Sequence, residues 1–290
     1  MTLKPRVGLD TSALNRLVKD SAPEPIIAGI LAGFDVVLPT MSYEEVLSTR
    51  NEELRIKLHN ICRRLLTSGI CIMPPHWVID KHVKTFHGNP QGYDWRQVPV
   101  RASVIEEEIH RSEFVFDAVL VEQQATELRR LQDEFESFFQ RSTVSAGTPK
   151  SFADWLALSK QTGGSLWNTT RLLYEGAFGP TSAIDKAVNL ASPPEDSTLN
   201  TFITACPPVT AVVYALELTL FDRSVRPLNE PSFKAGRNDQ LMSVYLPYCD
   251  QFLTDDRGQH KSLTEVAEKA GVSVQVRLFD EFSSSFIIGN

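Results

Sequence analysis

Four acidic residues, split between the two ends of this 290-residue chain, each lie at or just beyond a short apolar segment. The acidic residues are Asp10, Glu45, Asp239 and Asp256. Because the carboxyl ends of parallel strands lie along one edge of a sheet, this pattern predicts that the four carboxylates meet at that edge. Carboxylates brought together repel one another and stay ionised only if a cation joins them.

The spacing of apolar residues predicts an α/β fold with a central parallel sheet, because strands alternate with helices. The expected strands are residues 6–10, 35–38, 70–73, 251–254 and 272–278. The expected helices in these parts of the chain are residues 11–19, 26–33, 40–48, 53–68, 209–221, 238–246 and 263–270. The edge formed by the strand carboxyl ends is the expected binding site.

The middle of the chain has a different character and reads as mainly helical. Apolar residues near a 3.6-residue period predict one long helix or two over residues 102–141. Further helices are expected over residues 152–160 and 181–190, and loops over 88–100, 142–151, 192–198 and 222–237. These patterns divide the chain into an N-terminal α/β half (1–87), a helical insertion (88–205) and a C-terminal α/β half (206–290).

Composition narrows the classes of function. The net charge of -7 excludes a surface that is basic throughout, so a nucleic acid must meet a local basic patch or bridging metal ions. The four cysteines lack zinc-type spacing and predict reduced, mostly buried thiols. The apolar stretch 202–221 is interrupted by Pro207, Pro208 and Glu217, which predicts a buried helix rather than a membrane span. With no signal peptide in the N-terminal sequence, we expect a cytoplasmic protein that uses no membrane.

Each acidic residue also has a simpler explanation in local helix chemistry. Asp10 or Thr11 can cap the helix that follows the first strand. Glu44 and Glu45 lie in a first helical turn, where the helix dipole favours negative charge. An aspartate before an apolar helix is commonly an N-cap, which accounts for Asp239, and consecutive aspartates before a glycine are typical of turns.

Together, the four signals follow the order of a known family. This order resembles that of PIN-domain nucleases. It consists of an Asp after strand one, a Glu six residues after the Pro of strand two, an Asp opening a late helix, and Thr-x-Asp after the next strand. The segment 238–256 is the most specific part, and the resemblance covers roughly residues 5–75 and 205–285. It implies a three-layer PIN-like domain with a central parallel sheet, interrupted by a mainly helical insertion that a minimal PIN domain lacks.

The resemblance also implies roles for individual residues. Asp10, Glu45, Asp239 and Asp256 would be the catalytic residues and metal ligands, and their neighbours Glu44 and Asp255 are the residues most easily confused with them. Thr11 or Ser12 would orient Asp10. The supporting residues would be Thr11, Asn15, Thr254 and Asp255, and Arg237 would contact a substrate phosphate.

All-oxygen ligands suit Mg²⁺ or Mn²⁺, which can activate water for phosphodiester hydrolysis. The leading hypothesis is therefore a Mg²⁺- or Mn²⁺-dependent endoribonuclease acting in RNA processing, defence or a toxin–antitoxin pair. Single-stranded or structured DNA is a second class of substrate, and an inhibitory partner protein or a homodimer is compatible with the resemblance. A non-catalytic scaffold or regulatory protein is the alternative of a different class. A phosphatase is disfavoured because residues 10–12 do not form a DxD motif.

Overall fold

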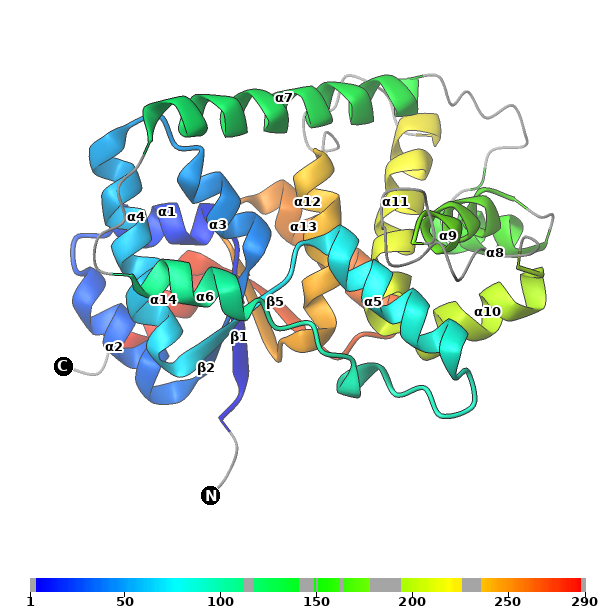
Figure 1. Ribbon diagram of the computed structural model, residues 1–290, viewed down its shortest axis with the longest axis horizontal. Coiled ribbons are helices and arrows are strands. Elements are labelled where there is room, and N and C mark those ends of the chain that lie inside the picture. The colour runs from blue at the N-terminus through cyan, green and yellow to red at the C-terminus, as the bar shows by residue number, and fades with distance from the viewer. Residues whose placement is uncertain are drawn as a thin grey trace.

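A computed structural model describes residues 4–111, 117–140, 149, 151–161, 164–177, 194–225 and 236–287. Five parallel strands form its central sheet in the order β3-β2-β1-β4-β5 (Figure 1). The strands are β1 (Arg6–Leu9), β2 (Asp35–Pro39), β3 (Gly69–Ile72), β4 (Gln251–Thr254) and β5 (Gln275–Leu278). The predicted α/β class and parallel sheet are confirmed, and each expected strand is present with small shifts at its ends.

Strand β1 lies in the centre and pairs with partners from opposite ends of the chain. Leu9 is in register with Leu253 of β4, and Gly8 is in register with Val37 of β2. The order of the strands reverses at β1, because the chain first adds β2 and β3 on one side and later β4 and β5 on the other. In an open parallel sheet, the connections leaving such a point diverge and form a crevice at the carboxyl ends.

Fourteen α-helices surround the sheet within the described residues. Those in the N-terminal part are α1 (Thr11–Lys19), α2 (Pro23–Gly33), α3 (Thr40–Leu47), α4 (Glu52–Leu65) and α5 (Pro75–Gly88). Those between β3 and β4 also include α6 (Ser103–His110), α7 (Ala118–Gln140), α8 (Phe152–Gln161), α9 (Ser165–Gly176), α10 (Asp196–Ala205), α11 (Pro207–Val225) and α12 (Arg237–Leu241). The last two are α13 (Arg257–Ala270) and α14 (Phe279–Ile287), and short 3₁₀ helices cover Leu66–Ser68, Trp95–Gln97 and Met242–Tyr248.

The two faces of the sheet pack against different helices, which makes three layers. Successive side chains on a strand point to opposite faces. Val36 and Leu38 accordingly join a core with α1, α2, α4 and α14, whereas Val37 joins a core with α5, α11 and α13. The second core continues into α8, α9 and α10 through residues such as Trp155 and Phe202. The middle helices therefore share one continuous apolar core with the sheet.

Several expected element boundaries need correction. The pattern over 102–141 forms two helices, α6 and α7. Helix α10 begins at Asp196, inside the expected loop 192–198, and α11 extends to Val225, inside the expected loop 222–237. Helix α13 begins at Arg257 rather than at 263, and β5 begins at Gln275 rather than at 272. Helices α5, α9, α10 and α14 were not predicted, and the expected helix 181–190 lies outside the described residues.

The apolar stretch around α11 is buried, as predicted. Val209, Ala211, Val212 and Val213 have no exposed surface. Within the described residues, no single helix has the length and apolar character to cross a membrane, and α10 with residues 207–223 passes that test only as a pair bent by 110°. The four cysteines are buried free thiols, also as predicted.

Glu217, fully buried on α11, links three of the helices in the middle of the chain. Its carboxylate accepts hydrogen bonds from Trp155 Nε1 at 2.8 Å, from Ser165 Oγ at 2.6 Å and from Thr169 Oγ1 at 3.2 Å. Burial raises the pKa of Glu217, and these donors oppose that effect. Because the donors come from α8 and α9, the carboxylate fixes both helices on α11.

We predict that Glu217→Ala lowers the free energy of unfolding by about 2–4 kcal/mol, because it leaves buried donors unpaired. Urea unfolding monitored by circular dichroism measures the change. Glu268→Ala, which removes an exposed carboxylate on α13, is the control and should change stability by less than about 0.5 kcal/mol. Equal effects of the two variants would contradict the structural role of Glu217.

Candidate active site

Asp10 lies at the carboxyl end of β1, next to β4 and at the point where the strand order reverses. Only 3% of its surface is exposed. It is the N-cap of α1, and its Oδ1 accepts a hydrogen bond of 2.7 Å from the backbone N–H of Ala13. The hydroxyls of Ser12 and Thr254 lie 2.9 Å from the carboxylate oxygens. The side chain is thus held by donors from the first turn of α1 and from β4.

The environment of Asp10 opposes its ionisation. Burial raises the pKa of Asp10 from its ordinary 3.8 to about 7, and the nearby charge of Glu45 adds to this effect. The hydrogen bonds from Ala13, Thr254 and Ser12 act in the opposite direction because they favour the charged form. A carboxylate in this state gains stability from any cation that reaches it.

Thr254 and Ser12 join the turn after β1 to the turn after β4. Ser12 Oγ accepts a hydrogen bond of 2.7 Å from the backbone N–H of Asp255, and Thr254 Oγ1 accepts one of 3.1 Å from that of Asp256. Thr254 Oγ1 also lies 2.7 Å from Gln259 Oε1. Since a hydroxyl has one proton, Thr254 donates to only one of Asp10 and Gln259 at a time.

Asp239 and Asp256 complete the acidic group from the C-terminal part of the chain. Asp239, on α12, accepts a hydrogen bond of 2.8 Å at Oδ2 from the N–H of Gly236. Burial raises the pKa of Asp239 to about 6, with further increases from the charges of Asp256 and Glu45. Asp256 is the N-cap of α13, and its Oδ1 accepts from the N–H of Gln259 at 2.9 Å.

Glu45, on α3, is the residue whose charge acts on both Asp10 and Asp239. Its Oε1 accepts a hydrogen bond of 2.6 Å from Asn238 Nδ2, which connects α3 to α12. The neighbouring Glu44 lines a separate cavity. The geometry therefore distinguishes the two glutamates, and Glu45 is the one that faces the other acids.

Two properties of the predicted acidic residues bear on metal binding; the first is shared by all four and the second by three of them. Within the described residues, none of them forms an ion pair with a lysine, arginine or histidine. Glu45 Oε2, Asp239 Oδ1 and Asp256 Oδ2 accept no hydrogen bond from those residues, because the contacts above use the other oxygen of each carboxylate. Each of these three side chains can therefore offer an oxygen to a cation while keeping its structural contact.

An all-oxygen donor set matches the preference of Mg²⁺ and Mn²⁺. In the described part of the chain, however, no group of three or more Asp, Glu, His and Cys side chains is placed so that it could hold a metal ion. The chemistry of the donors thus fits such an ion, whereas their present positions do not form a closed coordination site. More than two of the acids can bind the same ion only if their side chains rotate and bring the free oxygens together.

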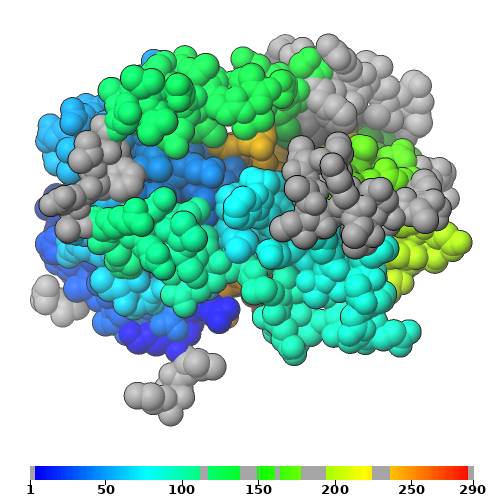
Figure 2. Space-filling view, viewed as in Figure 1, coloured from blue at the N-terminus to red at the C-terminus, as the bar shows by residue number. Residues whose placement is uncertain are grey.

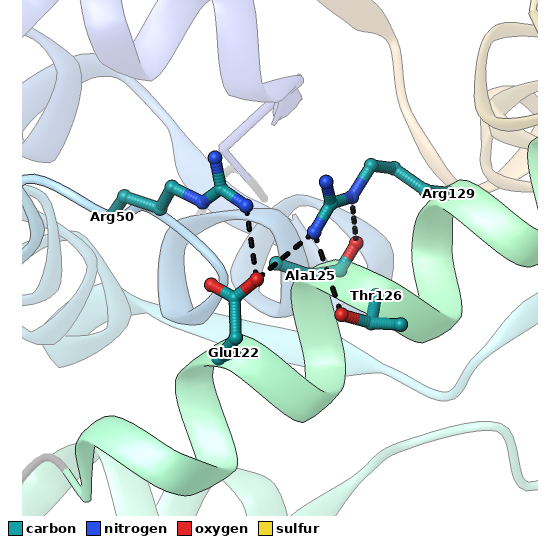
Figure 3. Close-up of polar contacts among 5 residues, drawn as sticks. All are labelled: Arg50, Glu122, Ala125, Thr126 and Arg129. Carbon is teal, nitrogen blue, oxygen red and sulfur yellow. Dashed lines mark hydrogen bonds and ion pairs between the residues drawn. The ribbon is translucent and has the colours of Figure 1, made fainter.

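A cavity of about 500 Å³ lies beside the acidic group and beneath α7. Helix α7 crosses α3 and α12 (Figure 1), and α12 is visible below it in the space-filling view (Figure 2). At one end of α7, Glu122 accepts hydrogen bonds from Arg50 at 2.9 Å and from Arg129 at 3.1 Å (Figure 3). Further along, Gln132 Oε1 accepts from the N–H of Arg237 at 2.8 Å. Helix α7 is therefore attached to both sides of the cavity that it covers.

Arg237 and Glu44 face this cavity with opposite charges. Burial raises the pKa of Glu44, and the charge of Arg237 lowers it. The guanidinium of Arg237 donates a hydrogen bond of 3.2 Å to Asn238 Oδ1, and Asn238 in turn binds Glu45. The predicted substrate-binding arginine is thus connected to the acidic group through one side chain.

Three predicted supporting residues have other roles. Thr11 does not orient Asp10, because its buried Oγ1 has no hydrogen-bond partner in the described part of the chain, and Ser12 takes that role instead. Asn15 donates to the backbone oxygen of Thr11 at 2.9 Å and stays within its own helix. Asp255 contributes its backbone N–H, whereas its side chain is exposed.

Two residues of the site were not identified from the sequence. Gln259 stands three residues after Asp256, the spacing of a capping box, and that pattern could have revealed it. Asn238 was part of the quoted family segment, but its hydrogen bond to Glu45 joins α12 to α3 across a long separation in sequence. No local pattern predicts such a contact.

Comparison with known proteins finds no matching family model, no matching curated protein and no matching solved structure.

We predict that, without divalent ions, the natural protein loses stability relative to the Asp10→Asn variant as the pH rises. The quantity compared is the free energy of unfolding of the two proteins at each pH. The folded-state pKa of Asp10, about 7, lies above its ordinary 3.8, so the folded state holds more protons between those values. The stabilising contribution of Asp10 is therefore present at low pH and is lost as the pH rises toward 7, by up to about 1.4 kcal/mol per pH unit.

Urea unfolding at several pH values between about 4 and 8, with EDTA, measures this difference. Asp255→Asn, which changes the exposed neighbouring carboxylate, is the matched control and should show no such trend. A difference between Asp10→Asn and the natural protein that is the same at every pH would contradict the prediction.

Proposed function

We propose that this protein is a Mg²⁺- or Mn²⁺-dependent nuclease of the PIN-like type, with RNA as its principal substrate. One observation carries the proposal: Asp10 is buried at the carboxyl end of β1, where the strand order reverses, its charge acts together with that of Glu45, and neither carboxylate forms an ion pair with the residues that the structure describes. The crevice at such a point is the usual binding site of an open parallel sheet. A bound divalent ion would neutralise this concentration of negative charge.

The arrangement of the sheet supports the same proposal. Asp10 and Asp256 follow adjacent parallel strands, Glu45 lies on the helix after β2, and Asp239 lies on the helix that precedes β4. The order of these acids along the chain and their gathering at one sheet edge agree with the resemblance to PIN-domain nucleases. The sheet order places the two ends of the chain, which carry that resemblance, side by side.

The residues that would hold the ion are Asp10, Glu45, Asp239 and Asp256. When bound, a divalent ion supplies an activated water and stabilises negative charge on the leaving oxygen of a phosphodiester. The protein's part is to keep Asp10 in place through Ser12 and Thr254, and to keep Glu45 in place through Asn238. Arg237 adds a positive charge close to the acids and can contact a phosphate of the substrate.

A non-catalytic scaffold is the second candidate, and one specific observation favours it. Asp10, Asp239 and Asp256 each accept a backbone hydrogen bond at the start of a helix. Capping alone accounts for an aspartate at these positions. Capping does not account for Glu45, which contacts another side chain instead of a helix terminus.

We predict that Asp10→Asn and Asp239→Asn each reduce Mn²⁺-dependent cleavage by at least about 100-fold, because each removes a charge that the ion needs. The measurement is cleavage of tRNA, single-stranded RNA and single-stranded DNA by the purified full chain in Mn²⁺. EDTA is the metal-free control, and Asp255→Asn is the matched variant that should keep its activity. Retained cleavage in both Asp10→Asn and Asp239→Asn would rule out this site.

We also predict that Mn²⁺ raises the melting temperature of the natural protein by about 5 °C or more at concentrations near 100 times its dissociation constant. Binding to the folded state alone stabilises it, and the effect should shrink in Asp239→Asn and persist in Asp255→Asn. Thermal unfolding with and without Mn²⁺ gives the values. A melting temperature that does not respond to Mn²⁺, together with no cleavage, would favour the scaffold.

A further inference from the structure

The cavity beneath α7 combines apolar walls with three charged side chains, Glu44, Glu127 and Arg237, of which Glu127 forms an ion pair with Arg130. Most of its lining side chains are apolar, among them Met41, Leu128, Phe135 and Leu241. Glu44 and Arg237 lie in the same lining and influence each other's ionisation. Within the described residues they form no ion pair, so more than 4.0 Å separates their charged atoms. The carboxylate of Glu44 and the guanidinium of Arg237 therefore line the cavity without a direct contact between them.

The hydrogen-bonding capacity of these two side chains is largely unused. Glu44 accepts no hydrogen bond from the described residues, and Arg237 uses its guanidinium only toward Asn238. A carboxylate offers acceptors only, and a guanidinium offers donors only. A complementary ligand must therefore present adjacent donors beside adjacent acceptors, on a flat body that can pack against apolar walls.

We propose that this cavity binds a guanine base. Guanine presents N1–H and the N2 amino group as adjacent donors for Glu44, and O6 and N7 as acceptors for Arg237. Adenine would direct its N1 lone pair at the carboxylate, and cytosine offers the carboxylate one donor group only. A cavity of about 500 Å³ lies within the range that small-ligand sites occupy, and a base can fill it from the open side.

The position of the cavity links guanine binding to the acidic group. Arg237 binds Asn238, and Asn238 binds Glu45, so a base held by Arg237 lies two side chains away from the candidate metal ligands. A guanine in the cavity would place the neighbouring phosphates of its strand beside those acids. This part of the inference rests on the proposed nuclease function, whereas the binding of a guanine base does not require cleavage.

The first experiment measures binding of GMP, AMP, CMP and UMP to the full chain by calorimetry, in EDTA so that no divalent ion contributes. We expect GMP to bind at least about tenfold more tightly than the other three. Glu44→Gln and Arg237→Gln should each reduce that preference to about twofold or less. Leu128→Trp, which fills the cavity from α7, should abolish binding.

The matched controls are Glu268→Gln and Arg64→Gln, which change exposed charges far from the cavity in sequence and should leave the preference intact. Circular dichroism confirms that each variant is folded. Glu44→Gln keeps the size of the side chain and removes no hydrogen bond, so it tests the site even if Leu128→Trp fails to fold. Equal binding of all four nucleotides, no binding of any, or a preference that survives both Glu44→Gln and Arg237→Gln would overturn the proposal.

A second experiment distinguishes a guanine within a nucleic-acid strand from the guanine of a free nucleotide. Single-stranded uridine oligonucleotides with and without one guanosine are titrated under the same conditions. Tighter binding of the guanosine-containing strand supports recognition of a substrate strand, whereas binding of GMP alone supports a free guanine nucleotide as the ligand. Cleavage in Mn²⁺ is measured separately. Cleavage without a preference for guanine would refute guanine binding by the cavity and support the proposed nuclease function. A preference for guanine without cleavage would support guanine binding and contradict the nuclease function.

Discussion

A buried carboxylate that forms no ion pair with any described residue is the constraint on which the centre of this molecule depends. Asp10 is stabilised at the end of β1 by hydrogen bonds from Ala13, Ser12 and Thr254. Two of these donors lie in the first turn of α1, and the third belongs to β4. The register between β1 and β4 therefore has two effects. It pairs the two strands in the sheet, and it places Thr254 where it can donate a hydrogen bond to Asp10.

The acidic residues show that a structural role and a chemical role are compatible in one side chain. A carboxylate that caps a helix uses one oxygen and leaves lone pairs on the other. The helix starts therefore hold Asp10, Asp239 and Asp256 in position, as capping side chains. Glu45, which caps nothing, depends on Asn238 for its position and connects α3 to α12.

The sequence predicted those features that depend on local patterns. Each strand is a short apolar run, so all five could be located, and the parallel class followed from the alternation with helices. Helix α5 was not predicted, although a proline at its first position, Pro75, is typical of a helix start. Its residue His82 is fully buried between the hydroxyls of Tyr93 and Tyr248.

Contacts between distant segments lay beyond prediction from the sequence. Ser12 and Thr11 are equally plausible supports for Asp10 in the sequence, and only the turn geometry selects Ser12. The same holds for Glu44 and Glu45, which point toward different neighbours because successive residues on a helix are turned by about 100°. The attachment of α7 to Arg50 and Arg237 likewise joins residues that no local pattern connects.

The pairing of β1 with β4 also affects how the sheet forms while the chain is being synthesised on the ribosome. Strands β1, β2 and β3 leave the exit tunnel long before β4, so one edge of β1 has no partner until β4 has been synthesised. Asp10 and Glu45 are then present without Asp239 and Asp256. The nascent chain therefore carries an incomplete acidic group until the segment with β4 has left the tunnel.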